Sequence, residues 1–308
     1  MVKFQNISKN YGTNKAVRDV SFSVNEGELF GLIGPDGAGK STLFRILVTT
    51  LLADSGTVLF DGKDVVSDYK YIRENVGYMP GKFSLYQDLS VTENLQFFAT
   101  IFNTTIEENY ELIKDIYQQL EPFGDRKAGA LSGGMKQKLA LSCALIHKPK
   151  VLVLDEPTFG VDAVSRKEFW DMLKSLKAKG VTILVSTPYM DEAELCDRIA
   201  LIQKGEILEI DTPEGIVSKF KKQLFVIKNV AVYPALKALT ADEKTTHAYS
   251  FGQEIHVYAD AQTSANAIEK ILENAGLKGA TVALGKPNIE DCFMELMVTG
   301  NLEETVHG

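Results

Sequence analysis

The segment Gly34-Pro35-Asp36-Gly37-Ala38-Gly39-Lys40-Ser41-Thr42 constrains the fold of this chain more than any other feature. It matches the pattern G-x-x-x-x-G-K-[ST] and follows the short apolar run Leu29–Ile33. In such a segment the glycines let backbone N–H groups surround phosphate oxygens, and the following helix adds the positive end of its dipole. The sequence therefore predicts a strand, a phosphate-binding loop and then a helix. A Gly-rich turn without a ligand is the weaker interpretation in this context.

Side-chain chemistry extends this prediction to a nucleotide and a metal. We expect Lys40 to reach the β and γ phosphates and Ser41 to give its hydroxyl to Mg²⁺. Asp155 and Glu156 end a second apolar run, Val151–Leu154, and so lie at the edge of the sheet nearest the phosphate loop. We assign Asp155 to Mg²⁺ through water and Glu156 to the general base. Without the phosphate loop, a plain strand end would be preferred for Asp-Glu-Pro.

A second anion-binding device is predicted at Leu131-Ser132-Gly133-Gly134-Met135-Lys136-Gln137, which precedes a helical run. Ser132 and the two glycines place a hydroxyl and bare amides at a helix N-terminus. A simple helix N-cap is the alternative and would be favoured in isolation. One γ-phosphate can use both devices only if two chains meet.

Composition limits the class of protein. The 308 residues predict about two domains. A net charge of -8 disfavours broad electrostatic binding of nucleic acid. No apolar stretch approaches the roughly 18 residues that span a bilayer, and the first residues show no signal-peptide core. The three widely spaced cysteines favour reduced thiols over disulfides or zinc.

Hydrophobic patterning predicts an α/β core that a helical block interrupts. Strands are expected at Val2–Ser8, Val17–Val24, Leu29–Ile33, Val151–Leu154 and Val181–Val185, with hairpins at Asp61-Gly62 and Lys204-Gly205 and helices within about 91–147. The segment after Phe220 alternates in a βαββαβ order.

With these motifs in order, residues 1 to about 218 resemble the nucleotide-binding subunit of ABC transporters, in particular exporters with ABC-2 type permeases. The resemblance implies a P-loop NTPase fold of ABC type: a parallel-sheet core, an antiparallel β subdomain and a helical subdomain at about 85–148. Residues 219–308 resemble the small α+β, ferredoxin-like accessory or regulatory domain of such exporters. By the same resemblance, Tyr11 stacks on adenine, Leu131 to Gln137 form the LSGG signature and Asp162 belongs to the D-loop.

The resemblance also implies a mechanism and partners. Two subunits form a head-to-tail dimer, with ATP and Mg²⁺ between the phosphate loop of one and the signature of the other. Closure on ATP and reopening after hydrolysis drive an integral-membrane permease of ABC-2 type. The expected place is the cytoplasmic face of the cell membrane, where the permease holds the chain as a peripheral subunit. The C-terminal domain regulates or strengthens dimerisation, or is a stabilising appendage.

Two residues depart from the family pattern. Gly81 stands where the family usually has a Gln that contacts Mg²⁺, the attacking water and the permease-facing loop, and Pro188 stands at the switch His. In one interpretation Glu156 and water suffice for slow turnover. In the other the site is degenerate, and the chain pairs with a second, complete ATPase subunit.

Two further functions compete with an exporter ATPase. A soluble ABC-class protein of DNA repair or translation usually carries a coiled-coil insertion or two cassettes, which this sequence lacks. A regulatory module that binds ATP without hydrolysis is favoured by Gly81 and Pro188 and disfavoured by Glu156. Stable association with a membrane protein distinguishes the exporter ATPase from the soluble protein.

Overall fold

The computed structural model describes residues 1–82, 85–242 and 245–306. The chain divides into two compact units, one of Met1–Pro213 with Leu296–Gly308 and the other of Glu214–Glu295. The division falls a few residues before the boundary predicted near residue 218. The assignment of residues 219–308 to an accessory or regulatory domain stays a prediction.

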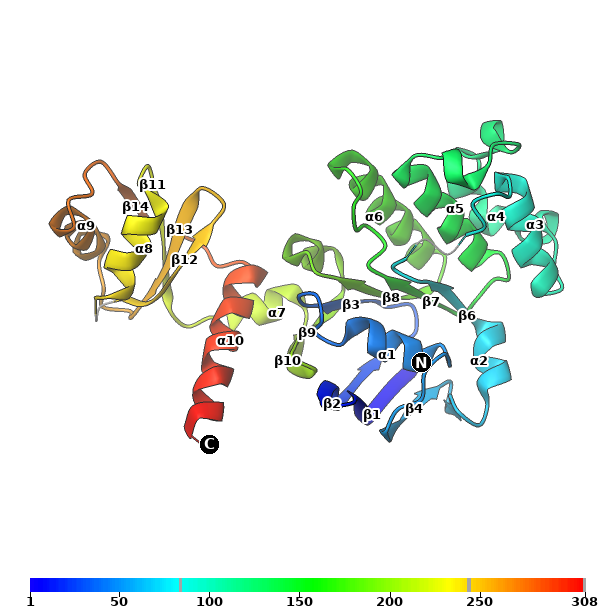
Figure 1. Ribbon diagram of the computed structural model, residues 1–308, viewed down its shortest axis with the longest axis horizontal. Helices are drawn as coiled ribbons and strands as arrows, with labels where there is room; N and C mark the ends of the chain where they lie inside the picture. Colours follow the sequence, from blue (N-terminus) through cyan, green and yellow to red (C-terminus); the bar gives the residue numbers. More distant parts are fainter. Residues whose placement is uncertain (83–84, 243–244, 307–308) are drawn as a thin grey trace. The chain divides into compact units, whose positions relative to one another are not determined.

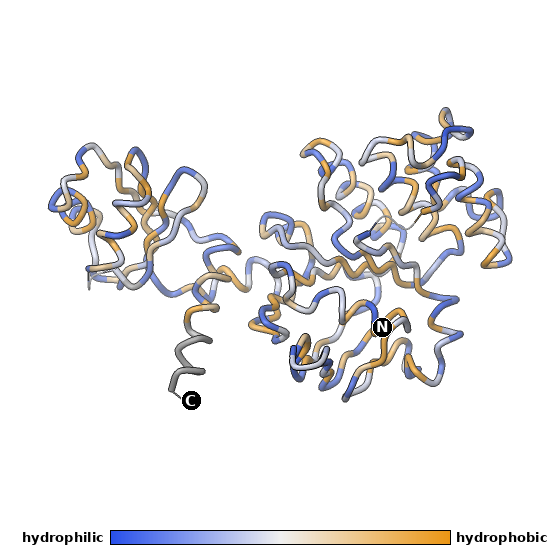
Figure 2. The backbone as a smooth tube through the Cα atoms, viewed as in Figure 1, coloured by the Kyte–Doolittle hydropathy of each residue, from blue (hydrophilic) through white to orange (hydrophobic). Residues whose placement is uncertain are grey.

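A six-stranded sheet runs through the first unit (Figure 1). Its order is β10-β9-β3-β8-β7-β6, and all neighbours are parallel except the β9–β10 hairpin. The strands are β3 Leu29–Ile33, β6 Val76–Met79, β7 Val151–Asp155, β8 Thr182–Thr187, β9 Arg198–Gln203 and β10 Glu206–Asp211. Every residue of β3, β7 and β8 is buried, as their continuous apolar runs predict. Figure 2 shows this apolar character as orange along the middle of the unit.

An antiparallel sheet of order β2-β1-β4-β5 forms a second layer, and α1 lies between the two sheets (Figure 1). Its strands are β1 Val2–Tyr11, β2 Asn14–Val24, β4 Ser55–Phe60 and β5 Lys63–Asp64. The hairpin predicted at Asp61-Gly62 joins β4 to β5. Buried side chains from both sheets and α1 form one hydrophobic core. The antiparallel β subdomain is therefore confirmed.

Helices complete the first unit, and α5 and α6 lie on the face of the six-stranded sheet opposite α1 (Figure 1). The helices are α1 Lys40–Leu47, α2 Tyr69–Asn75, α3 Val91–Ile101, α4 Ile106–Tyr117, α5 Gly133–Leu145 and α6 Ala163–Ala178, with short 3-10 turns η1 Glu121–Phe123, η2 Ala128–Ala130 and η3 Met190–Leu195. Ser90 and Thr105 begin α3 and α4 with capping boxes, so side chains satisfy the free N–H groups there. The predicted helical block is confirmed.

The second unit has the predicted βαββαβ order and an antiparallel sheet of order β12-β13-β11-β14. Its elements are β11 Gln223–Lys228, α8 Val232–Thr240, β12 Thr245–Phe251, β13 Glu254–Ala259, α9 Ala265–Asn274 and β14 Thr281–Leu284. Two helices, α7 Pro213–Ser218 and α10 Ile289–Val306, include residues of both units. α8 and α9 share one core with the sheet. This is the ferredoxin-like arrangement expected from the sequence.

Among the described helices of either unit, none has the length and apolar character that a bilayer crossing requires.

Close packing of β6 on α5 yields a stability prediction. A Cβ added to Gly77 of β6 would lie 2.3 Å from the Ala144 carbonyl oxygen in α5, so one of the two backbones must move. We expect Gly77→Ala to lower the free energy of unfolding by about 1–3 kcal/mol in urea titrations. Gly133→Ala is the control, because nothing lies within 4 Å of the added Cβ. Equal stability of Gly77→Ala and wild type would contradict this packing.

Candidate functional site

The phosphate loop connects β3 to α1, and backbone contacts fix its shape. The Gly34 N–H donates to the Thr187 carbonyl oxygen of β8 at 3.2 Å. Gly39 caps α1 with φ 106°, and a Cβ there would lie 2.5 Å from the Ala16 carbonyl oxygen. Only glycine satisfies both conditions at this position. The helix predicted to follow the loop begins at Lys40.

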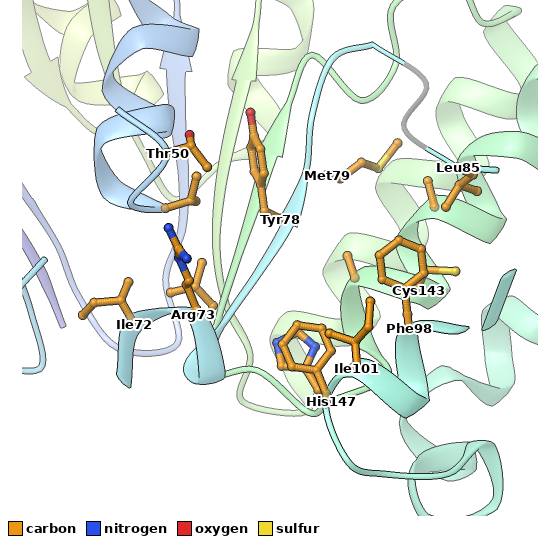
Figure 3. A pocket seen from close by; sticks show the side chains of 15 residues that line it. Thr50, Ile72, Arg73, Tyr78, Met79, Leu85, Phe98, Ile101, Cys143 and His147 are labelled. Atoms are coloured by element: carbon orange, nitrogen blue, oxygen red, sulfur yellow. The ribbon is translucent and has the colours of Figure 1, made fainter. Parts of the chain in front are cut away.

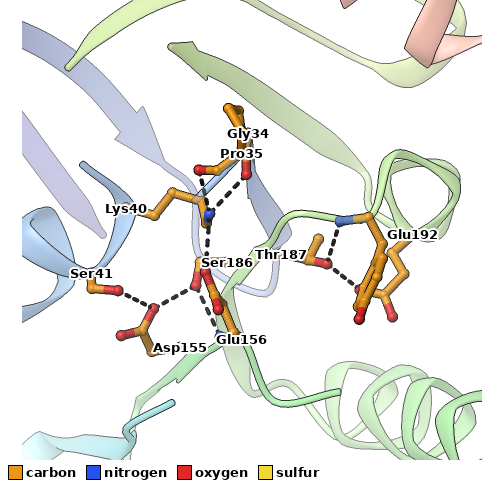
Figure 4. A network of polar contacts seen from close by, with 10 residues as sticks. Gly34, Pro35, Lys40, Ser41, Asp155, Glu156, Ser186, Thr187 and Glu192 are labelled. Atoms are coloured by element: carbon orange, nitrogen blue, oxygen red, sulfur yellow. Dashed lines mark hydrogen bonds and ion pairs between the residues drawn. The ribbon is translucent and has the colours of Figure 1, made fainter. Parts of the chain in front are cut away.

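Lys40 brings the phosphate loop and β7 together (Figure 4). Its side chain is 3% exposed, and its ammonium group donates to the carbonyl oxygens of Gly34 at 2.7 Å and Pro35 at 3.0 Å. The same ammonium group forms an ion pair with Glu156 Oε1 at 3.0 Å. An ammonium group has three donors, and these partners match that number. The structure thus juxtaposes Lys40 and Glu156, while their roles toward phosphate and water stay proposals.

Asp155 presents a buried carboxylate beside Ser41. Its Oδ1 accepts from Ser41 Oγ at 3.0 Å and from Ser186 Oγ at 2.7 Å, and the residue is 5% exposed. In the described part of the chain, Asp155 forms no ion pair with lysine or arginine. Burial, together with the Asp155 charge, raises the pKa of Tyr78 to about 12. A buried carboxylate without a cation is costly, and this one is positioned to receive a cation.

The donor set at Asp155 fits Mg²⁺. A hydroxyl and a carboxylate oxygen are hard ligands, and Mg²⁺ keeps its remaining positions for water and phosphate. Within the described ranges, no group of three His, Cys, Asp or Glu residues could hold a metal by protein ligands alone. Ser41 and Asp155 therefore suit a metal that arrives with a phosphate-bearing ligand.

Glu156 has an unusual backbone conformation. Its φ is 50°, in the left-handed region that non-glycine residues rarely adopt. The Glu156 N–H donates to Ser186 through both the carbonyl oxygen, at 3.1 Å, and Oγ, at 3.0 Å. Its carbonyl oxygen accepts the Phe159 N–H at 3.1 Å. These bonds hold a strained conformation at the residue assigned as general base.

Sequence reasoning missed the polar residues that surround this carboxylate pair. Ser186 and Thr187 are fully buried at the end of β8, and Glu192 of η3 is 2% exposed. Glu192 accepts from Thr187 Oγ1 at 2.5 Å (Figure 4). It also accepts from Thr158 Oγ1 at 2.8 Å. One signal was available: Ser186 and Thr187 directly follow the apolar run Val181–Val185, at the sheet edge where Asp155 lies.

The signature segment begins α5. Ser132 caps the helix by accepting the Met135 N–H at 3.3 Å, and Leu131 before it is buried. Gly133 and Gln137 line a cavity of about 170 Å³ together with Gly81 and Glu156. The phosphate loop is not among its lining residues. The helix N-terminus predicted for Ser132, Gly133 and Gly134 is confirmed, whereas its action on a second subunit stays a proposal.

Tyr11 and Asp162 lie where their predicted roles require accessible side chains. Tyr11 ends β1 and is 44% exposed. Asp162 caps α6 by accepting the N–H groups of Val164 at 3.1 Å and Ser165 at 3.0 Å. Hydrogen bonds from Ser165, with a smaller contribution from Val164, hold the pKa of Asp162 below its ordinary value. Stacking of Tyr11 on adenine and a D-loop role of Asp162 remain untested predictions.

The two departures lie at strand ends beside the carboxylates. A Cβ on Gly81 would lie 3.0 Å from the Asp155 carbonyl oxygen, so this glycine packs closely against the end of β7. Pro188 directly follows Thr187, the last residue of β8. Neither residue has a side-chain donor. The site therefore has two positions beside Asp155 and Glu156 from which no side chain can bind a phosphate or a water.

An apolar groove lies between α2, β6, α3 and α5, with a volume of about 350 Å³ (Figure 3). We name it the α2–α5 groove. Its lining includes Ile72, Phe98, Ile101, Met79 and His147. Burial lowers the pKa of His147 to about 4, so this side chain is neutral near pH 7. Apart from Arg73, the side chains that line the groove are therefore uncharged near pH 7.

Comparisons with known sequences place these motifs in a family context. A family model described as ABC transporter matches residues 17–159. The probable multidrug ABC transporter ATP-binding protein YbhF of Escherichia coli is 40% identical over 218 residues, which are 70% of this chain and 38% of YbhF. This chain therefore matches well under half the length of that relative. The Nod factor export ATP-binding protein I of Burkholderia thailandensis is 36% identical over 299 residues, or 96% of each chain.

A solved structure supports the same relationship. The ATP-binding cassette MJ0796, described as a dimeric post-hydrolysis state bound to ADP and Pi, has a TM-score of 0.62 and 26% identity. The alignment covers 69% of this chain and 98% of that chain.

The buried ammonium leads to a binding prediction. Lys40→Ala removes the positive charge of the loop, and we expect it to weaken ATP binding by about 100-fold in fluorescent-nucleotide titrations. Lys167→Ala is the matched control, since Lys167 is exposed on α6. Thermal unfolding must show that both variants are folded. Unchanged ATP affinity in a folded Lys40→Ala protein would refute the assignment.

Proposed function

We propose that this chain, which belongs to the ABC transporter family of ATP-hydrolysing proteins, is the ATP-binding subunit that energises a membrane exporter with an ABC-2 type permease. One observation carries the proposal: Lys40, Asp155 and Glu156 meet beside the phosphate loop, with the Ser41 hydroxyl on Asp155. Two relatives have names that refer to multidrug transport and to Nod factor export. These names support export without identifying what this chain helps to move.

Each residue of the site has a separate role in the proposed hydrolysis of ATP. Lys40 and the loop N–H groups bind and orient the phosphates. Ser41 would hold Mg²⁺ through its hydroxyl, and Asp155 would hold the metal through water. The metal, when bound, neutralises charge that develops on the transferred phosphoryl group. Glu156 accepts a proton from the attacking water. When the triphosphate binds, it replaces Glu156 as a partner of Lys40. Nucleotide binding itself therefore frees the Glu156 carboxylate to act as the base.

A dimer explains the signature. Ser132, Gly133 and Gly134 present the N-terminus of α5, a site that favours anions. Within one chain this N-terminus lines a cavity whose lining excludes the phosphate loop. We infer that it serves the ATP bound to a second subunit. The dimeric form named for MJ0796 is in keeping with this arrangement.

The identity of the second subunit has two candidate answers. In a self-dimer, both pockets depend on Glu156 and water, and turnover is slow. In a mixed dimer, the pocket with Gly81 and Pro188 is a weak regulatory site, while the intact signature completes the pocket of a complete ATPase partner. The absence of side-chain donors at Gly81 and Pro188 favours the mixed dimer, and the retained Glu156 favours the self-dimer.

The α2–α5 groove is the proposed contact with the permease. It is apolar, it adjoins Met79, which lies two residues before Gly81, and its rim includes Ile101, which is 54% exposed. A short amphipathic segment of a permease would bury these side chains. The chain would then lie at the cytoplasmic face of the membrane as a peripheral subunit.

Steady-state hydrolysis tests the enzyme proposal. We expect Mg-ATP turnover by the purified chain to rise with protein concentration, because dimers are the active species. Glu156→Gln should retain ATP binding and lose about 100-fold or more in turnover. Glu194→Gln is the control, since Glu194 is exposed and outside the site. Wild-type turnover in Glu156→Gln would remove Glu156 as base, and binding without turnover in wild type would indicate the mixed dimer.

A charge in the groove tests the permease contact. Ile101→Asp should shift the chain from the membrane fraction to the supernatant of its host cells, because an unpaired carboxylate cannot be buried cheaply. ATP affinity should stay within about twofold of wild type, since the groove does not include the phosphate loop. Val66→Asp is the control: Val66 is 57% exposed and is not part of the groove. Equal membrane retention of both variants would exclude the groove as the contact.

A further inference from the structure

Glu192 is a buried carboxylate that the proposed mechanism does not use. It is 2% exposed, and one of its oxygens accepts a hydrogen bond from Thr187 Oγ1 (Figure 4). Its other oxygen accepts from Thr158 Oγ1. Arg166 Nε of α6 lies 4.0 Å from Glu192 Oε1. A charge at this depth carries a desolvation cost, and an apolar side chain of similar volume would often pack as stably. Packing alone therefore does not account for a glutamate here.

The partners of Glu192 belong to the two strand ends that form the site. Thr187 ends β8, and its carbonyl oxygen accepts the Gly34 N–H of the phosphate loop at 3.2 Å. Thr187 Oγ1 also accepts a hydrogen bond from the Tyr189 N–H at 3.0 Å, and this bond forms a tight turn at Pro188. Thr158 lies two residues after Glu156. One carboxylate thus links the Pro188 turn to the loop that begins at Glu156.

The backbone of Glu156 needs such a link. Its left-handed φ of 50° persists only where surrounding contacts fix it. Ser186 fixes the N–H of Glu156 from the β8 side. After Glu156 the chain continues through Pro157 to Thr158, which is 1% exposed and bound to Glu192. Glu192 therefore anchors the second side of the strained residue.

We propose that Glu192 is a positioning residue that holds Glu156 in its left-handed conformation, by fixing Thr158 to the end of β8. Pro188 has no side-chain donor that could help to hold Glu156 in place. The hydrogen bonds of Thr187 and Glu192 must therefore do so. The value of this geometry for catalysis rests on the proposed role of Glu156 as general base. The structural link between Glu192 and the loop that begins at Glu156 does not depend on that proposed role.

Amide hydrogen exchange on the full-length, nucleotide-free chain tests the link directly. Glu192→Met keeps the side-chain volume and removes both acceptors. We expect it to speed exchange at Phe159 and Val161, whose N–H groups bond to Glu156 and Thr158, by about tenfold. Exchange in β11 and β13 of the second unit should not change. Glu194→Met, two residues along the same turn and exposed, is the matched control.

Conservative variants separate positioning from general destabilisation. Glu192→Gln can still accept from one hydroxyl and donate to the other, so it should restore most of the protection. Thr158→Val removes the same bond from the opposite side with little change in shape, and provides the test if Glu192→Met fails to fold. Wild-type exchange at Phe159 and Val161 in folded Glu192→Met or Thr158→Val would overturn the proposal.

Turnover supplies a second readout. Glu192→Met should lower kcat by about 10- to 100-fold and leave ATP affinity within twofold, because misplacement of the base affects the chemical step. Faster exchange with unchanged kcat would overturn the claim that this geometry matters for reaction. If wild type neither binds nor hydrolyses ATP, the proposed function fails, and hydrogen exchange still decides whether Glu192 positions the loop.

Discussion

One buried positive charge organises the first unit's site. The Lys40 ammonium binds two carbonyl oxygens of its own loop and the Glu156 carboxylate, so it connects the β3–α1 turn to the end of β7. A ligand that takes the place of Glu156 must bring comparable negative charge, or the buried ammonium is left uncompensated. This need for negative charge favours phosphate-bearing ligands, and it does so even though Lys40 contacts no other part of the ligand.

The adjacent carboxylate, Asp155, has no such charged partner among the described residues. Asp155 accepts two hydroxyl hydrogen bonds and, in the described part of the chain, pairs with no lysine or arginine. A site in which Lys40 can exchange Glu156 for an anionic ligand and Asp155 pairs with no described lysine or arginine is completed by a metal and a polyphosphate together. The Ser41 hydroxyl, which lies between the loop and Asp155, is where these two requirements meet.

Sequence patterns predicted the strands and helices better than they predicted the side-chain contacts between them. Continuous apolar runs located β3, β7 and β8 because strands buried on both faces need no polar alternation. The Gly-rich loop and Lys40 followed from one short motif. The Glu192 network escaped because Glu192 meets Thr158 and Thr187 only after the chain folds, and nothing in the local pattern marks it as buried. The left-handed φ of Glu156 was likewise invisible, since non-glycine residues seldom adopt it.

The backbone of Glu156 sets stability and activity against each other at one position. Glycine adopts φ near 50° without strain, whereas the carboxylate of Glu156 contributes to the site only if the strain is retained. Glu156→Gly would relieve this strain but leave the buried Lys40 ammonium without its carboxylate, so two opposing effects act on stability at this position. Selection of variants for thermal tolerance alone therefore does not preserve Glu156. Improvement of this chain by directed evolution needs a screen that reads nucleotide turnover at every round.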